Sequence, residues 1–346
     1  MFDGGFADFK KLYKILDLST EESKIEKLLY AVPKILSNIQ CNKIQNFIEE
    51  NQIQIAHFHY GTDCGVFFPF TKRINIPSVV SFYGYDCSSF PKFMMGNGKK
   101  YLSNRVFKRV TKVIAMSPDM KKDLLELGCP EEKIIVHYFG SDCKKFYLPQ
   151  KQFDNKEIVT ILNLGSLVPK KGQLFLLKSI AEIAKKGITN FRLRIIGTGI
   201  LEKELKAYIH HHNLSRFVEF VGAIPYGNNE LLREYHNADI FVHPSVIDSN
   251  GEKEGIPGTI VEAMSAALPV ISTYHAGIPY IITNKVTGIL VNEHDVEALT
   301  NALIELINNS ELRKLIGLAG QRYAIENLDL IKKEIELEQI YQQIIL

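Results

Sequence analysis

The sequence predicts an α/β fold of two doubly wound domains, each built on a parallel sheet covered by helices. The chain has 346 residues, whereas single hydrophobic cores stop growing near about 250–300 residues. Short runs rich in β-branched residues alternate with helical periods in both halves of the chain. Most of these runs are apolar at every position, as strands buried on both faces are.

The predicted strands form one group in each half of the chain. Each run is short and leads into a glycine or a polar turn. In the first half we expect strands at residues 53–58, 78–82, 112–115 and 133–137. In the second half we expect strands at residues 159–164, 192–196, 217–221, 240–243 and 269–272.

Helical periods separate these strands. We expect helices at residues 25–49, 101–109, 120–127, 173–186, 202–211, 229–237 and 258–267, and a nearly all-helical tail from residue 297. Pro149 and a polar run at residues 147–156 interrupt the periodicity. We therefore place the domain boundary between residues 152 and 153.

Composition excludes several classes of protein. Hydrophobic residues make up 46% of the chain and charged residues 23%, which excludes a disordered chain, a collagen-like repeat and a disulfide scaffold. We expect no signal peptide, and no apolar stretch approaches the roughly 18 residues of a membrane span. The scattered, odd-numbered cysteines predict reduced thiols in a cytoplasmic protein. They are Cys41, Cys64, Cys87, Cys129 and Cys143.

Charge is unevenly distributed, although the net charge is only +2. Residues 1–152 hold 22 Lys and Arg against 16 Asp and Glu, and the remainder holds 19 against 23. Between Lys92 and Lys122, nine basic residues accompany a single acid, Asp119. Such a field favours phosphates or an anionic membrane surface. The alternative is a solvated helix face, and no nucleic-acid partner is expected.

The segment at residues 244–264 carries the richest chemistry. A strand leads into a polar loop, and a helix then begins near Pro257, a residue suited to a first helical turn. Gly255 and Gly258 leave backbone N–H groups uncovered at that helix start, which favours an anion. Glu254 and Glu262 flank the same point, and a carboxylate can accept two hydroxyl groups of a sugar. The alternative is a solvated acidic loop.

Two further strand ends carry glycines. Residues 163–172 offer Lys170 and Lys171, the positive charge that a diphosphate needs, although a surface turn has the same pattern. Residues 195–199 supply another glycine pair. Glu202 stands where a third glycine would complete a dinucleotide fingerprint, so NAD binding is only weakly supported.

Histidines mark a strand end in the first half. His57 and His59 are two residues apart and therefore face the same side of a strand, as a metal pair could. No further ligand cluster completes such a site, so no metal is expected. Residues 210–212, three histidines at a helix end, are interpreted as structural.

Together, these segments resemble the retaining glycosyltransferases of family 4, which have the two-domain GT-B fold. Glu254 to Glu262 resembles the E-x7-E element of that family. Similar matches to G-R-L-V-x-K-K-G, I-G-x-G, A-D-I-F-V-x-P-S, E-A-M-A-x-G-x-P-V-I-S and H-G-G-I-P lie at residues 165–172, 196–199, 237–245, 262–272 and 275–279. Residues 57–61 and 82–86 resemble H-A-H-F-G and F-H-G-Y-D of bacterial exopolysaccharide and colanic-acid-type transferases. The resemblance covers about residues 53–325.

The resemblance implies two Rossmann-like domains facing across a cleft. Residues 1–152 would form the acceptor side and residues 153–325 the nucleotide-sugar side, with a C-terminal helix at 326–346 packing back on the first domain. No strand with a glycine-rich loop precedes residue 25. We therefore expect an incomplete first sheet in a chain that is shortened or rebuilt at its start.

The resemblance also implies roles for individual residues. Lys171 would neutralise the donor diphosphate, Glu262 would hold the ribose, and Glu254 would grip the donor sugar. The implied catalytic residues are Glu254, Tyr83 and Lys171. The implied donor-binding residues are Gly165, Ser166, Lys170, Lys171, Gly197, Ile224, Glu254, Gly255, Ile256, Pro257, Gly258 and Glu262. The implied acceptor-side residues are His57, His59, Gly61, Tyr85 and Asp86.

Several positions depart from the family pattern. Ser166 replaces an arginine, which removes one diphosphate cation, and Tyr83 replaces a histidine near the donor sugar. Ala276 and Tyr280 replace a glycine and a glutamate.

The implied function is transfer of a sugar, with retention, from a UDP- or GDP-sugar to a lipid-linked or glycan acceptor in bacterial cell-surface polysaccharide synthesis. Neither a metal nor another cofactor is expected, and the protein is expected in the cytoplasm, peripheral on the inner face of the membrane. One alternative is a degenerate GT-B protein that binds nucleotide sugar or a partner without turnover. Another is a nucleotide-sugar epimerase.

Overall fold

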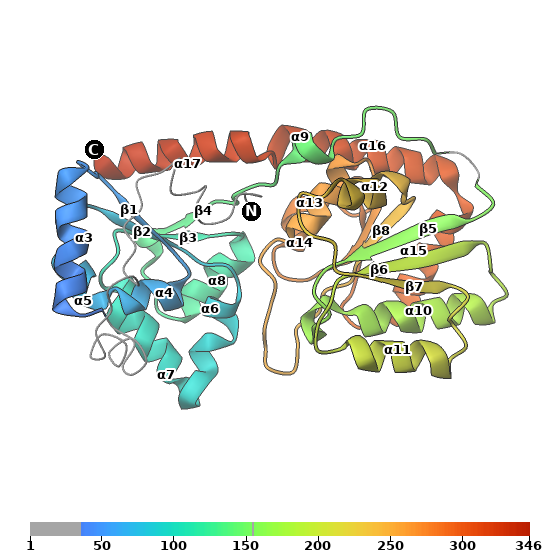
Figure 1. Ribbon diagram of the computed structural model, residues 1–346, viewed down its shortest axis with the longest axis horizontal. Helices are drawn as coiled ribbons and strands as arrows, with labels where there is room; N and C mark the ends of the chain where they lie inside the picture. The colour runs from blue at the N-terminus through green and yellow to red at the C-terminus, as the bar shows by residue number, and fades with distance from the viewer. Residues whose placement is uncertain (1–35, 154–155) are drawn as a thin grey trace. The chain divides into compact units, whose positions relative to one another are not determined.

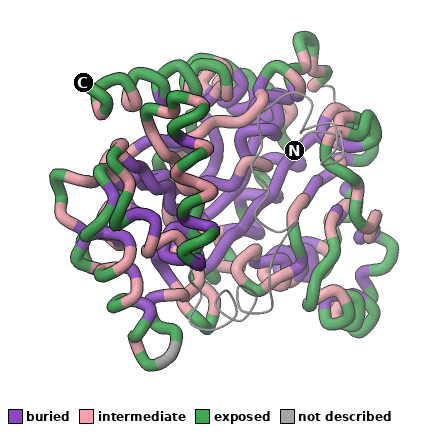
Figure 2. Tube along the Cα trace, turned by 60° about the vertical axis from the view of Figure 1, so that its left-hand side comes forward, coloured by how far each residue is buried: buried purple, intermediate pink, exposed green. Residues whose placement is uncertain are grey.

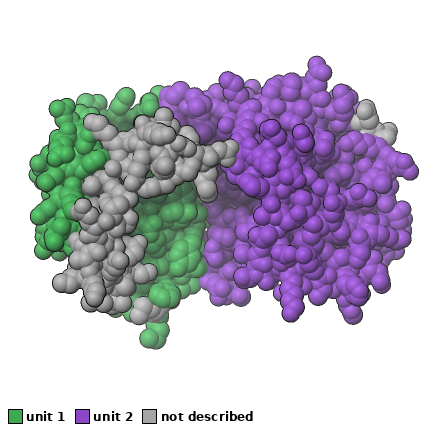
Figure 3. Space-filling view, viewed as in Figure 1, with its two compact units in different colours: residues 1–137, 337–346 green, residues 138–336 purple. Residues whose placement is uncertain are grey.

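A computed structural model describes residues 36–153 and 156–346, and the chain divides into two compact units (Figure 3). Unit 1 comprises residues 1–137 and 337–346, and unit 2 comprises residues 138–336. This division falls earlier than the boundary predicted at residues 152 and 153. The reason is that α9 (Cys143–Phe146) already packs against helices of unit 2, and Ser141 pairs with Asp329.

Unit 1 contains a four-stranded parallel sheet in the order β1-β2-β3-β4. Its strands are β1 (Ala56–His59), β2 (Ser78–Ser81), β3 (Lys112–Ala115) and β4 (Ile134–Val136). Its helices are α3 (Asn38–Glu50), α4 (Gly61–Val66), α5 (Phe68–Thr71), α6 (Tyr85–Ser88), α7 (Phe93–Leu102) and α8 (Pro118–Glu126). The predicted lack of earlier strands concerns residues outside the described part of the chain.

Unit 2 contains a six-stranded parallel sheet in the order β10-β9-β8-β5-β6-β7. Its strands are β5 (Val159–Leu164), β6 (Phe191–Ile196), β7 (Val218–Gly222), β8 (Ile240–His243), β9 (Val270–Thr273) and β10 (Ile289–Val291). Its helices after α9 are α10 (Gln173–Lys185), α11 (Glu202–His211), α12 (Asn229–Asn237), α13 (Gly258–Ser265), α14 (Ile278–Ile281), α15 (Val296–Asn308) and α16 (Ser310–Asn327). The final helix, α17 (Leu330–Ile345), begins in unit 2 and ends in unit 1.

Helices cover both faces of the sheet in unit 2. α10 and α11 lie on one side of the strands, and α12, α13 and α16 lie on the other (Figure 1). Ile161, Leu193 and Val242 of the sheet are fully buried in a core shared with α10, α11 and α15. The tube in Figure 2 shows the buried strands between helices whose outer faces are exposed. The α/β class predicted from the alternating pattern is therefore confirmed.

Every predicted strand is present, with small shifts at the ends, whereas several helices differ from prediction. Of the helix expected at residues 25–49, the part from Asn38 onward is confirmed as α3, which begins only after Ser37. Residues 25–35 lie outside the described part of the chain. Ser37 Oγ accepts a hydrogen bond from Gln40 N at 3.1 Å, and Gln40 Oε1 accepts one from Ser37 N at 2.9 Å. This reciprocal cap sets the helix start.

Other differences lie where apolar runs are short or contain glycine. The helix expected at residues 101–109 begins earlier, at Phe93, and continues through a π-helical turn at Ser103–Phe107. Gly96 and Gly98 in its first half disfavour a helix in sequence-based reasoning. Strand β10 was not predicted, because three residues give too little pattern to separate a strand from a turn.

No helix within residues 36–153 and 156–346 combines the length and the apolar character required to cross a lipid bilayer. All five cysteines lie in the described part of the chain and are buried.

Strands β5 and β8 are neighbours at the centre of the second sheet, and the connections leaving them diverge from there. After β5 the chain passes to β6 and β7 on one side, and after β8 it passes to β9 and β10 on the other. This is the topological switch point at which open parallel sheets bind ligands. The loops at residues 165–172 and 244–257 leave the carboxyl ends of these two strands.

The two loops touch closely at Gly172. Its backbone is left-handed, with φ of +68°, and a Cβ atom there would lie 1.9 Å from the carbonyl oxygen of Pro244. Val246 N also donates to Lys170 O at 2.9 Å. Glycine at 172 therefore fixes the approach of the loop after β5 to the loop after β8.

Replacing this glycine with alanine tests the contact. We expect Gly172→Ala to lower the free energy of unfolding by about 3 kcal/mol, from left-handed strain plus overpacking against Pro244. Gly187 has a similar φ of +78° with nothing within 4 Å of an added Cβ, so Gly187→Ala should cost only about 1 kcal/mol. Urea denaturation followed by circular dichroism measures both values. Equal losses of unfolding free energy in the two variants would show that residue 172 does not lie as close to the Pro244 carbonyl as the structure indicates.

Candidate functional site

The loop after β5 brings two lysines to the carboxyl edge of the second sheet. Gly165 and Ser166 follow the strand directly, and a 3-10 turn at Pro169–Lys171 presents Lys170 and Lys171. Gly172 ends the turn and begins α10. Gln173 Nε2 donates to Ser166 O at 3.0 Å, which holds the loop against the first turn of that helix.

The side chain of Asp248 stabilises a turn in the loop after β8. Asp248 Oδ1 accepts hydrogen bonds from Asn250 N and Glu252 N, both at 2.8 Å. Gly251 adopts a left-handed conformation with φ of +75° in this turn. The turn directs Glu252 and Glu254 back toward the loop after β5.

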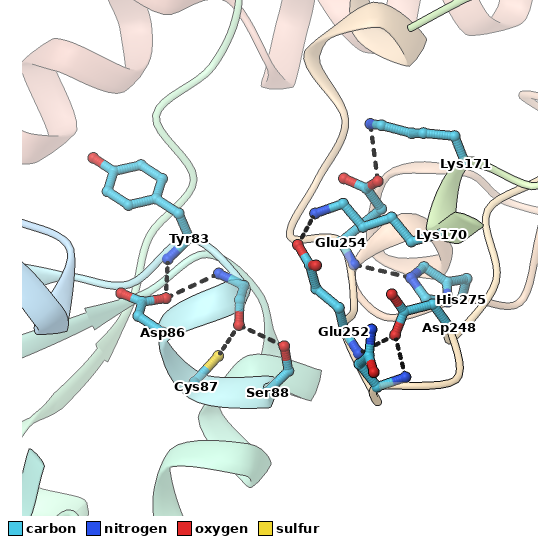
Figure 4. Close-up of polar contacts among 12 residues, drawn as sticks. Tyr83, Asp86, Cys87, Ser88, Lys170, Lys171, Asp248, Glu252, Glu254 and His275 are labelled. Atoms are coloured by element: carbon cyan, nitrogen blue, oxygen red, sulfur yellow. Dashed lines mark hydrogen bonds and ion pairs between the residues drawn. The ribbon is translucent and has the colours of Figure 1, made fainter. Parts of the chain in front are cut away.

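Two ion pairs join the loops (Figure 4). Lys171 Nζ lies 2.8 Å from Glu254 Oε1, and the two side chains are only 15% and 10% exposed. Lys170 Nζ lies 2.5 Å from Glu252 Oε1, with side chains 20% and 28% exposed. The lysines and the first glutamate that the sequence analysis singled out are therefore brought together.

Glu254 is charged despite its burial. Burial acts to raise its pKa, but the positive charges of Lys171 and Lys170 outweigh this effect and hold the pKa below the ordinary value. His243, the last residue of β8, is fully buried, and burial together with Lys171 lowers its pKa to about 3. His243 is therefore neutral beside the ion pair.

Glu262, the second glutamate, lies one helical turn inside α13 and is buried. Its Oε2 accepts a hydrogen bond from the hydroxyl of Tyr235 on α12 at 2.7 Å. Burial raises the pKa of Glu262, although the Tyr235 hydrogen bond and the Lys145 charge act against this. A Cβ atom at Gly258 would lie 3.9 Å from Glu262 Oε1, so the glycine leaves space beside that oxygen.

The start of α13 lies between the two glutamates. Ile256 and Pro257 are buried and Gly258 is the first helical residue. Among the described residues, no side chain caps this helix start. The first N–H groups of α13 and the two carboxylates thus lie at one edge of unit 2.

The loops after β6 and β7 adjoin this edge. Gly197 N donates to Gly222 O at 2.8 Å, and Gly165 N donates to Ile196 O at 3.0 Å. A Cβ atom on Gly197 would lie 2.0 Å from Gly165 O. Ile224 is half-buried in the loop that follows β7.

A histidine and a glutamate fix the backbone of Glu254. The N–H of Glu254 donates to Nε2 of fully buried His275 at 3.0 Å. His275 Nδ1 lies 2.6 Å from Oε1 of Glu293, which follows β10. Sequence reasoning placed His275 in a motif but missed Glu293, because no motif includes it.

Unit 1 carries a second polar cluster, at the carboxyl ends of β1 and β2. His57 Nε2 is hydrogen-bonded to Ser81 Oγ at 2.6 Å, and His59 Nδ1 to the Tyr83 hydroxyl at 2.5 Å. The two imidazole rings stack with centroids 4.7 Å apart. The parallel register pairs His57 with Val79 and His59 with Ser81, so each histidine reaches the hydroxyl two residues further along.

The C-terminal helix completes this cluster. The hydroxyl of Tyr341 on α17 is hydrogen-bonded to His57 Nδ1. Burial, with His59 and His137 nearby, lowers the pKa of His57 to about 4. Sequence reasoning missed Tyr341, which lies 284 residues from its partner and belongs to no motif.

Asp86, which the resemblance places on the acceptor side, stabilises the loop after β2. Its side chain is fully buried and accepts hydrogen bonds from Gly61 N at 2.8 Å, Tyr83 N at 3.0 Å and Gly84 N at 3.1 Å. Figure 4 shows Asp86 turned toward the backbone beside Tyr83. Gly61 is buried too, whereas Tyr85 is 45% exposed.

In the part of the chain that the structure describes, no group of three His, Cys, Asp or Glu side chains could hold a metal ion. The expectation that no metal or cofactor takes part stays a prediction.

Two family models match the chain. The model described as "Glycosyl transferases group 1" matches residues 145–323, and the model described as "Glycosyltransferase Family 4" matches residues 27–145. The amylovoran biosynthesis glycosyltransferase AmsK of Erwinia amylovora is 33% identical over 254 residues, which cover 73% of this chain and 61% of that protein. A relative in Escherichia coli K12 named for colanic acid biosynthesis, WcaL, is 31% identical over 234 residues, which cover 67% of this chain and 57% of that protein.

Solved structures show the fold. The Anabaena protein HepE in complex with UDP matches with a TM-score of 0.76 at 17% identity, over 88% of this chain and 82% of that chain. A glycosyltransferase from Rickettsia africae matches with a TM-score of 0.76 at 22% identity, over 99% of this chain and 88% of that chain. The predicted GT-B fold, with a Rossmann-like domain around each sheet, is thereby confirmed.

The buried ion pair gives a stability test. Lys171→Met would leave the buried Glu254 carboxylate without its cationic partner, so we expect a loss of about 3 kcal/mol in the free energy of unfolding at pH 7. Lys170→Met, which breaks the more exposed pair with Glu252, should cost under about 1 kcal/mol.

The same variant predicts a pH dependence. The pKa of Glu254 lies below its ordinary value, so the pair stabilises the fold at neutral pH and this stabilisation is lost as the pH falls through the folded-state pKa. Urea denaturation measures the difference in the free energy of unfolding between wild type and Lys171→Met. This difference should become smaller as the pH is lowered. A difference that does not change with pH would contradict a charged Glu254.

Proposed function

Because the chain belongs to the group 1 glycosyl transferases, we propose that it transfers a sugar from a nucleotide-sugar donor to an acceptor hydroxyl. The observation that carries the proposal is the convergence of Lys171, Glu254 and Glu262 on the start of α13, at the switch point of the second sheet. Each residue type suits one part of a nucleotide sugar, and each comes from a different element.

We propose that the diphosphate of the donor binds between the lysines and the start of α13. A helix N-terminus presents N–H groups and a partial positive charge to an anion. Lys170 and Lys171 supply the positive charge that Ser166 does not. In the structure these two lysines are paired with Glu252 and Glu254, which lie in the loop that leads to that helix.

The two glutamates suit the two sugars of the donor. Glu262 accepts a hydrogen bond from Tyr235 through Oε2, while Oε1 lies beside the space left by Gly258. We propose that Oε1 accepts the ribose hydroxyls and that the base lies near Ile224. Glu254, with the backbone of residues 255–257, would hold the hydroxyls of the donor sugar.

The reaction that we propose proceeds with retention at the anomeric carbon. Breaking the glycosidic bond leaves negative charge on the departing diphosphate and positive charge on the sugar. We propose that Lys171 and the N–H groups of α13 stabilise the first of these charges, since groups positioned before the reaction accelerate it most. No metal is required in this scheme.

On the acceptor side, we propose a lipid-linked or glycan hydroxyl in bacterial cell-surface polysaccharide synthesis. AmsK and WcaL, by their names, act in amylovoran and colanic acid biosynthesis. The stacked His57 and His59, with Tyr83 and the exposed Tyr85, form the polar surface of unit 1 suited to hydroxyl groups. Asp86 supports this surface through the backbone.

A protein that binds nucleotide sugar without turnover is the second candidate. The observation that favours it is that each lysine already has a carboxylate partner, while Ser166 adds no cation. Such a protein would bind the donor but form no product.

Binding of nucleotide sugars tests the donor site. We expect one class among UDP-, GDP- and ADP-sugars to raise the melting temperature, since a ligand at 100 times its dissociation constant adds roughly 2.7 kcal/mol. Glu262→Ala should abolish the shift, and Glu262→Gln, which keeps the size of the side chain, should weaken it. Glu305→Ala, at an exposed position of α15, is the matched control.

Turnover then separates the two candidates. Product with the donor's anomeric configuration, read from proton coupling constants, supports the retaining transferase. Binding with no product from any lipid or glycan acceptor would favour the binding protein, and the absence of any thermal shift would rule out both.

We propose that unit 1 binds an anionic membrane surface. Phe93 and Met95 are 60% and 101% exposed at the start of α7, and Lys99, Lys100 and Lys108 are exposed nearby in the chain. Apolar side chains among lysines suit insertion at a negatively charged lipid interface. Arg105 is excluded from the test, because its guanidinium lies 4.7 Å from the Tyr101 ring centroid and supports the fold.

Sedimentation with vesicles of phosphatidylcholine and phosphatidylglycerol measures this binding. We expect glutamate at positions 99, 100 and 108 together to abolish it, because each replaced lysine removes about 1 kcal/mol of attraction and the added charges repel. Glutamate at the exposed positions Lys185, Lys186 and Lys203 of unit 2 makes the same change in net charge and should leave binding intact. Equal effects of the two triple variants would rule out a local membrane site.

A further inference from the structure

Glu293 connects two segments that lie far apart in the sequence. It follows β10 and its side chain is 19% exposed. Its Oε2 accepts a hydrogen bond from Ile247 N at 2.8 Å, and its Oε1 lies 2.6 Å from His275 Nδ1. One carboxylate therefore receives two N–H groups, one from backbone and one from a buried ring. His294 is a further ionisable neighbour, with Nε2 3.9 Å from Oε2.

The hydrogen bonds fix the tautomer of His275. Its Nε2 faces the backbone N–H of Glu254 at 3.0 Å. An amide N–H can only donate, so Nε2 must be the unprotonated acceptor. The ring proton is then on Nδ1, from which it is donated to Glu293. We call the two hydrogen bonds from Glu293 through His275 to the backbone of Glu254 the relay. Each group in the relay thus has a defined role as donor or acceptor.

This relay holds both ends of one loop segment. Ile247 is bound by Glu293 directly, and Glu254 is bound by the same carboxylate through His275. Between them, Asp248 closes the internal turn of the segment. The backbone at residue 254 is consequently fixed, and its side chain is directed to Lys171 at 2.8 Å.

We propose that Glu293 is a positioning residue for the donor sugar. It acts through His275 to set the backbone and side-chain direction of Glu254, and it does not itself touch the donor. This inference rests on the proposed function, in which Glu254 holds the sugar and Glu262 with the lysines holds the nucleotide. The inference predicts a larger effect on binding of the sugar part of the donor than on binding of the nucleotide, because the relay ends at Glu254 and does not include Glu262.

Glu293→Gln is the sharpest test, because it preserves the size of the side chain but not its pattern of acceptors. A carboxamide has one oxygen and one NH2 group. If its oxygen accepts from His275, its NH2 group faces the N–H of Ile247. If its oxygen accepts from Ile247, its NH2 group faces His275 Nδ1, and the tautomer that this requires points Nε2–H at the N–H of Glu254. Either orientation creates a contact between two donors.

The first readout compares a nucleotide with its sugar conjugate by calorimetry. We expect Glu293→Gln to bind the nucleoside diphosphate like wild type and to bind the matching nucleotide sugar about tenfold more weakly, since small misplacements at a site are costly. Glu297→Gln, at an exposed position on α15, is the matched control and should change neither affinity. A merely structural role for Glu293 would weaken both ligands together.

The second readout does not depend on ligand or activity. Long-range nitrogen–proton NMR spectra of histidine-labelled protein report the tautomer, and His275→Gln identifies the signal by its absence. We expect the proton of His275 on Nδ1 in wild type, because Nε2 accepts from the N–H of Glu254 and Nδ1 donates to Glu293. In the His275→Gln background, Glu293→Gln should cause little further loss of sugar affinity, because the relay is already broken.

The outcomes separate this inference from the proposed function. If wild type binds no nucleotide at all, the proposed function fails and the inference fails with it. If wild type binds both ligands and Glu293→Gln keeps the preference for the sugar conjugate, the inference alone is overturned. A proton on Nε2 of His275 in wild type would also overturn it, because Nε2 could then not accept from the N–H of Glu254.

Discussion

The pairing of β5 with β8 is the constraint on which the candidate site depends. Because parallel strands have their carboxyl ends at one edge, two loops separated by about seventy residues of chain must leave the sheet side by side. The close approach at Gly172 and the hydrogen bond from Val246 to Lys170 fix their spacing. The ion pairs between lysines and glutamates are possible only because that spacing is set by the backbone.

The site combines charges that compensate one another before any ligand binds. Glu254 is nearly buried yet ionised because Lys171 lies against it. Burial raises the pKa of Glu262, which accepts a hydrogen bond from the Tyr235 hydroxyl and interacts with the charge of Lys145. The two glutamates therefore have different electrostatic environments although they stand eight positions apart in the chain. In the proposed function, a diphosphate would compete with Glu252 and Glu254 for the lysines, whereas a ribose would meet the carboxylate of Glu262, whose close partner is the Tyr235 hydroxyl.

Local pattern predicts the strands, the loops at their ends and the motif residues well, because each depends on a few neighbouring positions. Lys171 and Glu254 could be placed at strand ends in this way. Tyr341, Glu293 and the inward direction of Asp86 could not, because they depend on contacts between distant segments. A glutamate after β10 or a tyrosine in the last helix has no local signature of its own. Strand β10 itself was missed since three apolar residues fit several structures equally well.

The path of α17 has a consequence for dissecting the molecule. Residues 337–346 belong with unit 1, although nearly two hundred residues of unit 2 precede them in the chain. A single cut therefore cannot release two intact halves. A fragment that ends at residue 137 would lack the hydrogen bond from the Tyr341 hydroxyl to His57. The remaining fragment would carry the end of α17 without the unit against which it packs. To express the units separately, residues 337–346 must be joined to the fragment that holds residues 1–137. A disruptive extension at the C-terminus would affect the sheet of unit 1.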